Sequence, residues 1–315
     1  MRMTRRHLRL SLAALWLLDG ALQCQPSMFT RNFSQSILAP ASRGLPSVLA
    51  APLHLLAAVV AAHPVLTNTG AALIQIALSA GLLTRRFTRP ALGASIAWAS
   101  MVWMAGEGFG GVATGATMLV GAPGAALLYV VLAVVAWPSP SREGERPSWW
   151  ALPAWSSLWL VGAGLQLVAG NDSSMSLTMA LRSAGASSPR WIARIDQGLA
   201  ATHLPRWTPA VVIALDVLVA MWALVPGWTR QVSLGLGSAF ALAQWLVFQG
   251  LGDLTSGQST DPNCGPLIVL LAWATLGAAP RRRRVSVDVG SLPTPVASGA
   301  SGAGLTVLEV SSGSR

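Results

Sequence analysis

Two carboxylates lie inside segments of the chain that are otherwise apolar. Asp19 interrupts the run "LWLLDGALQ" (residues 15–23), and Gln23 follows it by four positions, which places both on one face of a helix. Asp216 lies in the middle of another apolar segment. A charged side chain in such a segment usually faces a cavity or a partner, so both acids are candidates for binding a proton, a quinone headgroup or a polar solute. The structural alternative is hydrogen bonding between helices.

Two glycine-rich segments carry a second set of polar side chains. Residues 103–115 and 245–257 share the pattern W-x4-G-x-G-x4-G. Glycine permits tight turns, and such a loop can fold back into a helical bundle where protein covers it. Folded back, the loops would surround an outer vestibule with Glu107, Gln249, Asp253, Gln258, Asp261 and Asn263. The alternative is a plain turn in which glycine serves close packing.

Metal, haem and nucleotide chemistry are not indicated. The chain has four histidines, and His54 and His63 are nine residues apart, so one helix would not aim both at one ion. No C-x-x-C-H motif for haem occurs. The glycine pattern follows an apolar helix rather than a strand, and the chain lacks the lysine of a phosphate-binding loop. We therefore expect no metal site, and a quinone is the cofactor that the residues leave open.

The two cysteines, Cys24 and Cys264, could form a disulfide. The topology expected below places both at the outer, oxidising side of a membrane. A bridge would close a loop of about 240 residues, worth roughly 4–5 kcal/mol in the chain-entropy model. The alternative is two unreactive thiols that fill gaps between helices.

The composition predicts a membrane protein. The chain is 53% hydrophobic and 10% charged, whereas roughly 25% charged residues are usual in soluble domains. The net charge is +10, and every basic residue is arginine, which excludes lysine Schiff-base chemistry. The arginines are clustered at segment ends, so a nucleic-acid partner is not indicated. The arginine-only, alanine-rich composition is typical of a bacterium, and the lipid bilayer is the first expected partner.

A search for long apolar segments gives eight candidate membrane-spanning helices, several of them shorter than the roughly 20 residues of an untilted span. We place them near 8–23, 67–83, 90–106, 119–137, 149–169, 208–225, 231–249 and 264–279. The first resembles a signal peptide, but Asp19 interrupts it and Gln23 does not suit a lipidation site, so we expect a retained helix. Five arginine clusters then fall on one side, which predicts an inner-membrane protein with both termini in the cytoplasm.

Three further segments complete the expected organisation. Residues 47–62 and 190–201 should be short helices at the outer membrane surface. The segment 281–315 is rich in Ser, Gly and Val and should be a disordered cytoplasmic tail.

The two halves of the membrane region repeat each other. The run "LWLLDGALQ" (15–23) matches "LWLVGAGLQ" (158–166), which aligns Gln23 with Gln166, and residues 103–115 match 245–257 at nearly the same offset. Gln75 aligns with Asp216. A near-constant offset indicates duplication. We predict a four-helix repeat in 1–140 and a second in 141–280, related by a pseudo-two-fold axis along the membrane normal because four spans preserve orientation.

Each half resembles a DoxX-like unit, a four-helix membrane bundle. The stretches "RLSLAALWLLDGALQ" and "ALIQIALSAGLLTRRFTRPAL" carry the resemblance, in the order and spacing of that family. The family includes quinone-linked thiosulfate oxidoreductase subunits and proteins of redox maturation. Where the family has an acid and a lysine in its first two helices, this chain has Gln75 and Gln23. The resemblance implies the fold and a redox setting.

Three hypotheses about function follow. The first is a protein of two fused DoxX-like bundles that holds a quinone-type or small polar ligand in membrane redox chemistry. The second is a small-solute or proton-coupled permeation protein, and the third is a non-catalytic assembly subunit with a partner in the membrane. The candidate ligand-binding residues are Asp19, Gln23, Gln75, Glu107, Gln166, Asp216, Gln249, Asp253 and Asn263. No nucleophile–base pair identifies a reaction, so whether the chain is an enzyme is left open.

Overall fold

The computed structural model describes residues 3–138, 146–168 and 170–278. It is 78% helical, and no strand occurs within those ranges. The all-helical class expected from the sequence is therefore confirmed. The predicted tail 281–315 lies outside the described residues.

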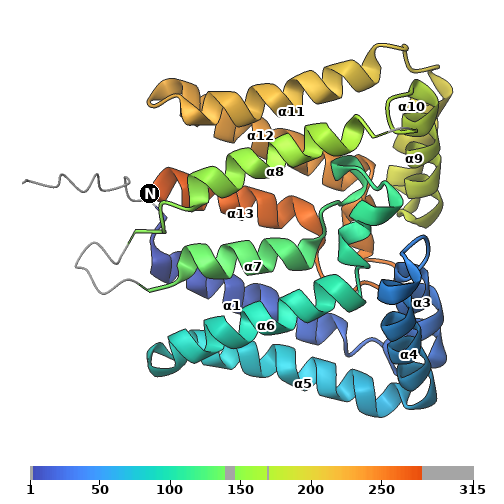
Figure 1. Cartoon of the computed structure of the whole chain (residues 1–315), viewed down its shortest axis with the longest axis vertical. Helices are drawn as coiled ribbons and strands as arrows, with labels where there is room; N and C mark the ends of the chain where they lie inside the picture. Colours follow the sequence, from blue (N-terminus) through green and yellow to red (C-terminus); the bar gives the residue numbers. More distant parts are fainter. Residues whose placement is uncertain (1–2, 139–145, 169, 279–315) are drawn as a thin grey trace, which may run out of the picture. The chain divides into compact units, whose positions relative to one another are not determined.

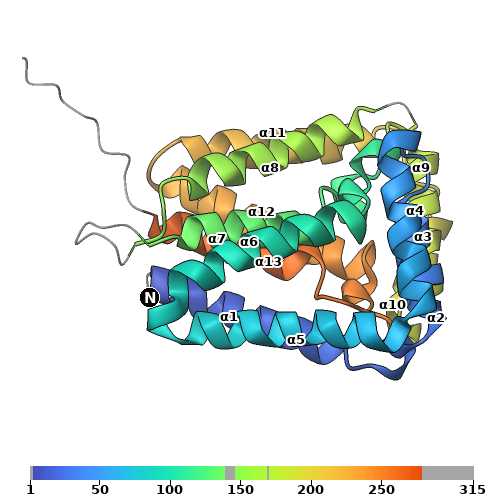
Figure 2. The same cartoon turned by 60° about the horizontal axis from the view of Figure 1, so that its bottom comes forward.

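Each of the eight expected apolar segments contains an α-helix. The helices are α1 (Arg5–Leu22), α5 (Pro64–Leu83), α6 (Thr88–Ala105), α7 (Ala125–Ala136), α8 (Ala151–Gln166), α11 (Thr208–Leu224), α12 (Trp228–Val247) and α13 (Cys264–Gly277). They run side by side in Figures 1 and 2. One boundary differs from expectation: α7 begins at Ala125 rather than near 119, because Gly121 and Gly124 have φ of +106° and +103°, which no α-helix accommodates.

The helices pack in the same order in both halves of the chain. In the first half α1 packs on α5 and α7, and α6 packs between α5 and α7. In the second half α8 packs on α11 and α13, and α12 packs between α11 and α13. The halves meet where α7 contacts α13 and α8. One continuous apolar core, which includes Leu132, Trp155 and Leu271, joins them.

Length and hydropathy distinguish one helix from the others. Among the described residues, only α5 is both long and apolar enough to cross a membrane by itself, while α4, α7, α11 and α13 are apolar but shorter. α1 and α12 begin with arginine and polar residues, which lowers their mean hydropathy.

A second group of helices crosses one end of the bundle (Figures 1 and 2). It comprises α2 (Arg31–Phe33), a π-helical turn (Ser34–Leu38), α3 (Ala39–Ala41), α4 (Ser47–Ala62), α9 (Ser174–Ser187) and α10 (Arg190–Ala201). α4 and α10 occupy the ranges predicted from the sequence, 47–62 and 190–201. α9 was not expected, because its sequence is rich in serine and alanine. Its signal is the spacing of Leu177, Leu181 and Ala184, which form its buried face.

The loops after α6 and α12 share the conformation of their patterned glycines and one tryptophan–carbonyl hydrogen bond. Trp103 Nε1 donates to the carbonyl oxygen of Pro123, and Trp245 Nε1 donates to that of Pro262, both at 2.7 Å. The three glycines of each pattern have closely matching positive φ angles: 54°, 66° and 79° at Gly108, Gly110 and Gly115, and 53°, 68° and 75° at Gly250, Gly252 and Gly257. These hydrogen bonds connect the end of α6 to the residues just before α7, and the end of α12 to the residues just before α13.

Candidate functional site

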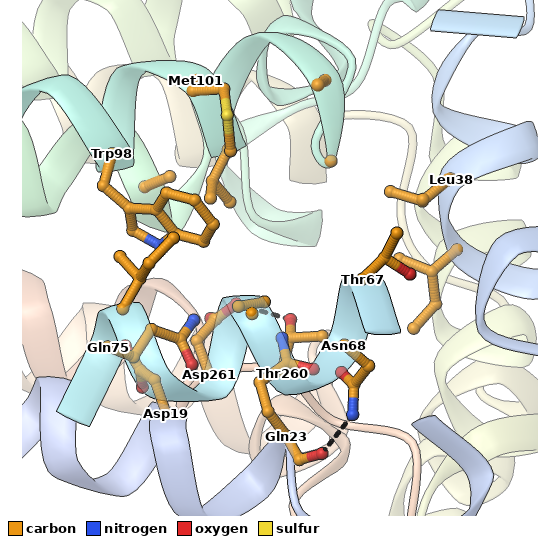
Figure 3. A pocket seen from close by; sticks show the side chains of 18 of the residues that line it. Asp19, Gln23, Leu38, Thr67, Asn68, Gln75, Trp98, Met101, Thr260 and Asp261 are labelled. Carbon is orange, nitrogen blue, oxygen red and sulfur yellow. Dashed lines mark hydrogen bonds between the residues drawn. The ribbon is translucent and has the colours of Figure 1, made fainter. Parts of the chain in front are cut away.

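A cavity of about 380 Å³ lies among the helices of the first half (Figure 3). α1, α5, α6 and α7 supply most of its lining. Leu38 and Val60 close it on the side of the crossing helices, and Thr260 and Asp261 enter it from the loop before α13. The walls are mainly apolar, so the few polar groups stand out and could orient a ligand.

The polar groups lie along two adjacent helices. Asp19 and Gln23 are one turn apart on α1, and Asn68 and Gln75 are two turns apart on α5. All four side chains are buried. The Nδ2 of Asn68 donates to the backbone carbonyl of Gln23 at 2.8 Å, which fixes the end of α1 against α5. The i, i+4 and i, i+7 spacings bring these groups to one side of the cavity.

Several polar atoms of the cavity have no hydrogen-bond partner in the described part of the chain. They are Asp19 Oδ1, Gln23 Oε1, Asn68 Oδ1, Gln75 Oε1, Trp98 Nε1, Glu107 Oε2 and the Tyr129 hydroxyl. A buried group that loses its water and gains no partner costs about 1–3 kcal/mol. One indole donor and several amide or carboxyl acceptors therefore face a space in which a ligand could satisfy them.

Aromatic side chains enclose the position of Asp19. Tyr129 of α7 lies beside the Asp19 carboxyl group. The ring of Trp16 packs on that of Tyr129 with their centroids 4.5 Å apart, and Trp16 Nε1 donates to Ser95 Oγ at 2.8 Å. The acid that interrupts the first apolar segment thus faces an aromatic, protein-covered cavity rather than the outside of the bundle.

Two further carboxyl groups stand at the end of the cavity. Glu107 Oε1 accepts a hydrogen bond from the backbone N–H of Ala126, in the first turn of α7, at 2.9 Å. Asp261 accepts from the backbone N–H of Asn263 at 2.7 Å and from Thr260 Oγ1 at 2.9 Å. Burial, with the nearby charge of Asp261, raises the pKa of Glu107 to about 8. Burial also raises the pKa of Asp261. Glu107 is therefore mainly protonated at neutral pH.

Glu107 predicts a pH-dependent stability. Its pKa is about 8 in the folded chain and 4.5 without the fold, so the folded state holds the proton more tightly. Between these values the free energy of unfolding should fall as the pH rises, by about 1.4 kcal/mol per pH unit for this group. Glu107→Gln removes the titration, and Gln249 shows that the equivalent loop accepts an amide. Between pH 5 and pH 8 the melting temperature should fall less in Glu107→Gln than in the wild type. If the two proteins show the same pH dependence, the raised pKa of Glu107 is wrong.

The remaining candidate residues lie away from this cavity. Gln166 donates to the backbone carbonyl of Asn171, and Gln249 Nε2 donates to that of Leu119 at 3.2 Å. Asn263 Oδ1 accepts from the N–H of Cys264 at 2.7 Å and caps α13, and Asp253 ends the 3-10 turn that follows α12. The structure thus brings Asp19, Gln23, Gln75 and Glu107 together and places Gln166, Asp216, Gln249, Asp253 and Asn263 elsewhere.

Asp216 occupies the second-half counterpart of the Asp19 position. Gly162 of α8 aligns with Asp19, and a Cβ added to Gly162 would lie 3.2 Å from Asp216 Oδ2. Each half therefore has one acid at the interface of its first two long helices, from α1 in one half and from α11 in the other. The same Cβ would lie 2.6 Å from the sulfur of Met118, so a methionine side chain fills the space beside Asp216.

Asn68, Trp98 and Tyr129 belong to the cavity but were not among the candidates. Asn68 precedes Gln75 by seven residues, so it could have been found from helical spacing. Trp98 and Tyr129 look like ordinary membrane aromatics in the sequence, and only the packing of α6 and α7 brings them to the cavity.

The cysteines are both free thiols. Cys264 is buried, and its Sγ donates to the carbonyl oxygen of Gly121 at 2.9 Å, whereas Cys24 is exposed and bonds to Gly20 of its own helix. The structure does not contain the bridge that the sequence left open. Cys264 fits the alternative of a packed, unreactive thiol.

Comparison of the chain with protein-family models, curated proteins and solved structures finds no match. The DoxX-like resemblance therefore rests on its two sequence stretches.

Proposed function

We propose that the chain is a bacterial inner-membrane protein whose eight long helices form two fused DoxX-like bundles. The matching order of helix packing in the two halves supports a duplication. The matched φ angles and tryptophan–carbonyl bonds of the two glycine loops support it independently. Helices shorter than the roughly 20 residues of an untilted span are compatible with this arrangement where the bundle packs them together.

The arginines support an orientation with the crossing helices outside. The start of α1, the α5–α6 turn and the α11–α12 turn lie at the end of the bundle opposite α4 and α10 (Figure 1). These places carry Arg5, Arg6, Arg85, Arg86 and Arg230. The positive-inside rule makes that end cytoplasmic, and the cavity then opens in the outer half of the bilayer.

The function that we infer is binding of a quinone-type ligand in the first-half cavity. The observation that carries it is the set of unpartnered polar atoms inside a mainly apolar cavity. A quinone carbonyl would accept from Trp98 Nε1 or from a protonated carboxyl group, and a hydroquinone hydroxyl would donate to Gln75 Oε1 or Asn68 Oδ1. A volume of about 380 Å³ holds a ring headgroup and the start of its tail.

Access from the lipid supports an amphipathic ligand rather than a free solute. Leu66, Ile74 and Met101 line the cavity, and each is also exposed on the outside of α5 or α6. A tail leaving between these helices would remain in apolar surroundings. Asp19 and Glu107 would exchange protons with the headgroup, and a redox partner in the membrane would exchange electrons.

Tryptophan fluorescence tests this proposal, because Trp16 and Trp98 line the cavity. Titration of the detergent-purified protein with a short-chain ubiquinone should give saturable quenching, which an excess of a plain alkane leaves unchanged. Quenching that rises linearly without saturation, or that the alkane reverses, would contradict a headgroup site.

A further inference from the structure

A second cavity, lined by arginines, lies at the other end of the first half. It measures about 880 Å³ and is formed by the first turn of α1, the α5–α6 turn and the end of α7. Six of its lining residues are arginines: Arg5, Arg6, Arg9, Arg85, Arg86 and Arg89. No acidic residue of the described chain lines it. Four of the six, Arg6, Arg85, Arg86 and Arg89, are exposed, and the concentration of like charge makes the cavity attractive to an anion.

Two of the arginines are buried at least in part, and one of them has donors without a partner in the described part of the chain. Arg9 is 93% buried, since only 7% of it is exposed, and Nη1 donates to Thr88 Oγ1 at 2.8 Å. Arg85 and Arg6 are close enough to Arg9 to repel it. The Nε and Nη1 atoms of Arg5 are buried and have no hydrogen-bond partner in the described part of the chain. Buried guanidinium donors of this kind normally bind carboxylate or phosphate.

Most arginines of the cavity have no arginine at the aligned position of the second half. Alignment of the halves sets Leu152 against Arg9 and Gly227 against Arg86, so only Arg230 remains, opposite Arg89. Arg230 Nε donates to the carbonyl oxygen of Ala223 at 2.8 Å, so a backbone group satisfies it.

From these observations we propose that the arginine-lined cavity binds a phosphate-bearing anion. Both a diphosphate and the headgroup of an anionic phospholipid have this chemistry. The planar guanidinium groups would engage phosphate oxygens in pairs, and the volume exceeds what a single phosphate needs. The site is separate from the quinone cavity, because no residue lines both.

The test compares two double variants of the full-length protein. Arg85→Gln with Arg86→Gln changes exposed arginines of the cavity, whereas Arg194→Gln with Arg206→Gln removes the same charge from exposed arginines that do not line it. Binding of pyrophosphate to detergent-purified protein is measured by calorimetry. The effect of a lipid headgroup is measured with the protein reconstituted in bilayer nanodiscs. The melting temperature in nanodiscs that contain phosphatidylglycerol is compared with that in nanodiscs of phosphatidylcholine alone.

We expect the Arg85→Gln, Arg86→Gln variant to bind the phosphate probe at least about ten-fold more weakly than the wild type, which is the scale of losing a charge-assisted hydrogen bond. The Arg194→Gln, Arg206→Gln variant should bind it as the wild type does. Loss with pyrophosphate identifies a soluble phosphate ligand, and loss with phosphatidylglycerol alone identifies a lipid headgroup. Equal weakening in both variants would show attraction by net charge only, and no binding of either probe would leave the cavity without a phosphate ligand. Either of these two results overturns the proposal.

Discussion

Replacing Gly110 with alanine should leave almost no folded protein. A Cβ at this position would lie 1.8 Å from the carbonyl oxygen of Pro123 and 2.2 Å from its carbonyl carbon. Both are backbone atoms, and the Trp103 indole already holds that carbonyl, so the loop cannot move aside without losing this bond. The positive φ of 66° adds strain of about 1–2 kcal/mol for alanine. The measurement is the yield of monodisperse protein in size-exclusion chromatography and its melting temperature.

Gly115→Ala separates the clash from the strain. Gly115 has φ of +79° in the same loop, but nothing lies within 4 Å of an added Cβ. This variant should fold and should melt a few degrees below the wild type, because only the strain of a left-handed backbone at alanine destabilises it. Gly252→Ala, with Pro262 O at 2.7 Å, should fall between the two. Equal yields of Gly110→Ala and Gly115→Ala would mean that the loop does not pack as closely as described.

Gln75→Leu should reduce quinone affinity at least about ten-fold, the effect of removing a contact that orients the headgroup. The folded protein should be as stable as the wild type or more so. Gln75 Oε1 has no partner among the described residues, and leucine would bury a side chain of similar size without an unsatisfied oxygen. Saturable tryptophan quenching gives the affinity, and a melt in the absence of quinone gives the stability.

Gln244→Leu is the matched control for that change. Gln244 of α12 is buried, both its amide atoms are unpartnered in the described part of the chain, and it does not line the cavity. It should gain stability like Gln75→Leu and keep the quinone affinity. If both variants lose affinity equally, the effect comes from helix packing. If neither loses affinity, the headgroup does not contact α5 at Gln75.

Much of the helical structure was predictable because hydropathy is a local property of the sequence. All eight predicted apolar segments contain helices, and the predicted helices 47–62 and 190–201 are α4 and α10. Asp19 and Gln23 could be joined because helical spacing fixes which side chains share a face. The start of α7 could not be placed, since an apolar run containing Gly121 and Gly124 looks continuous in hydropathy while its backbone turns.

The rest of the site depends on contacts between distant parts of the chain. Trp98 and Tyr129 face the cavity only because α6 and α7 pack on the helices that carry Gln75 and Asp19. The sequence predicted Asp261 in an outer vestibule. It did not predict that Asp261 lies near Glu107, because this approach depends on how the second half packs against the first. Asp19 and Asp216 lie on helices that are not equivalent in the two halves, α1 and α11. Only the structure shows that both acids lie between the first two bundle helices of their half.

Asp261 reaches the first-half cavity from the second half of the chain, so the two halves contribute unequally to it. Pro262 and Pro123 accept equivalent tryptophan bonds, so the residue opposite Asp261 in the first half is Ala122. A symmetric homodimer of the first half would therefore bring a methyl group, not an acid, to its neighbour's cavity. Under the proposed duplication, the copies have diverged into one that houses the ligand and one that completes its proton-bearing wall. The first half alone would therefore lack part of the wall of this cavity, and a chain cut between the halves would keep the complete site only if both pieces stayed associated.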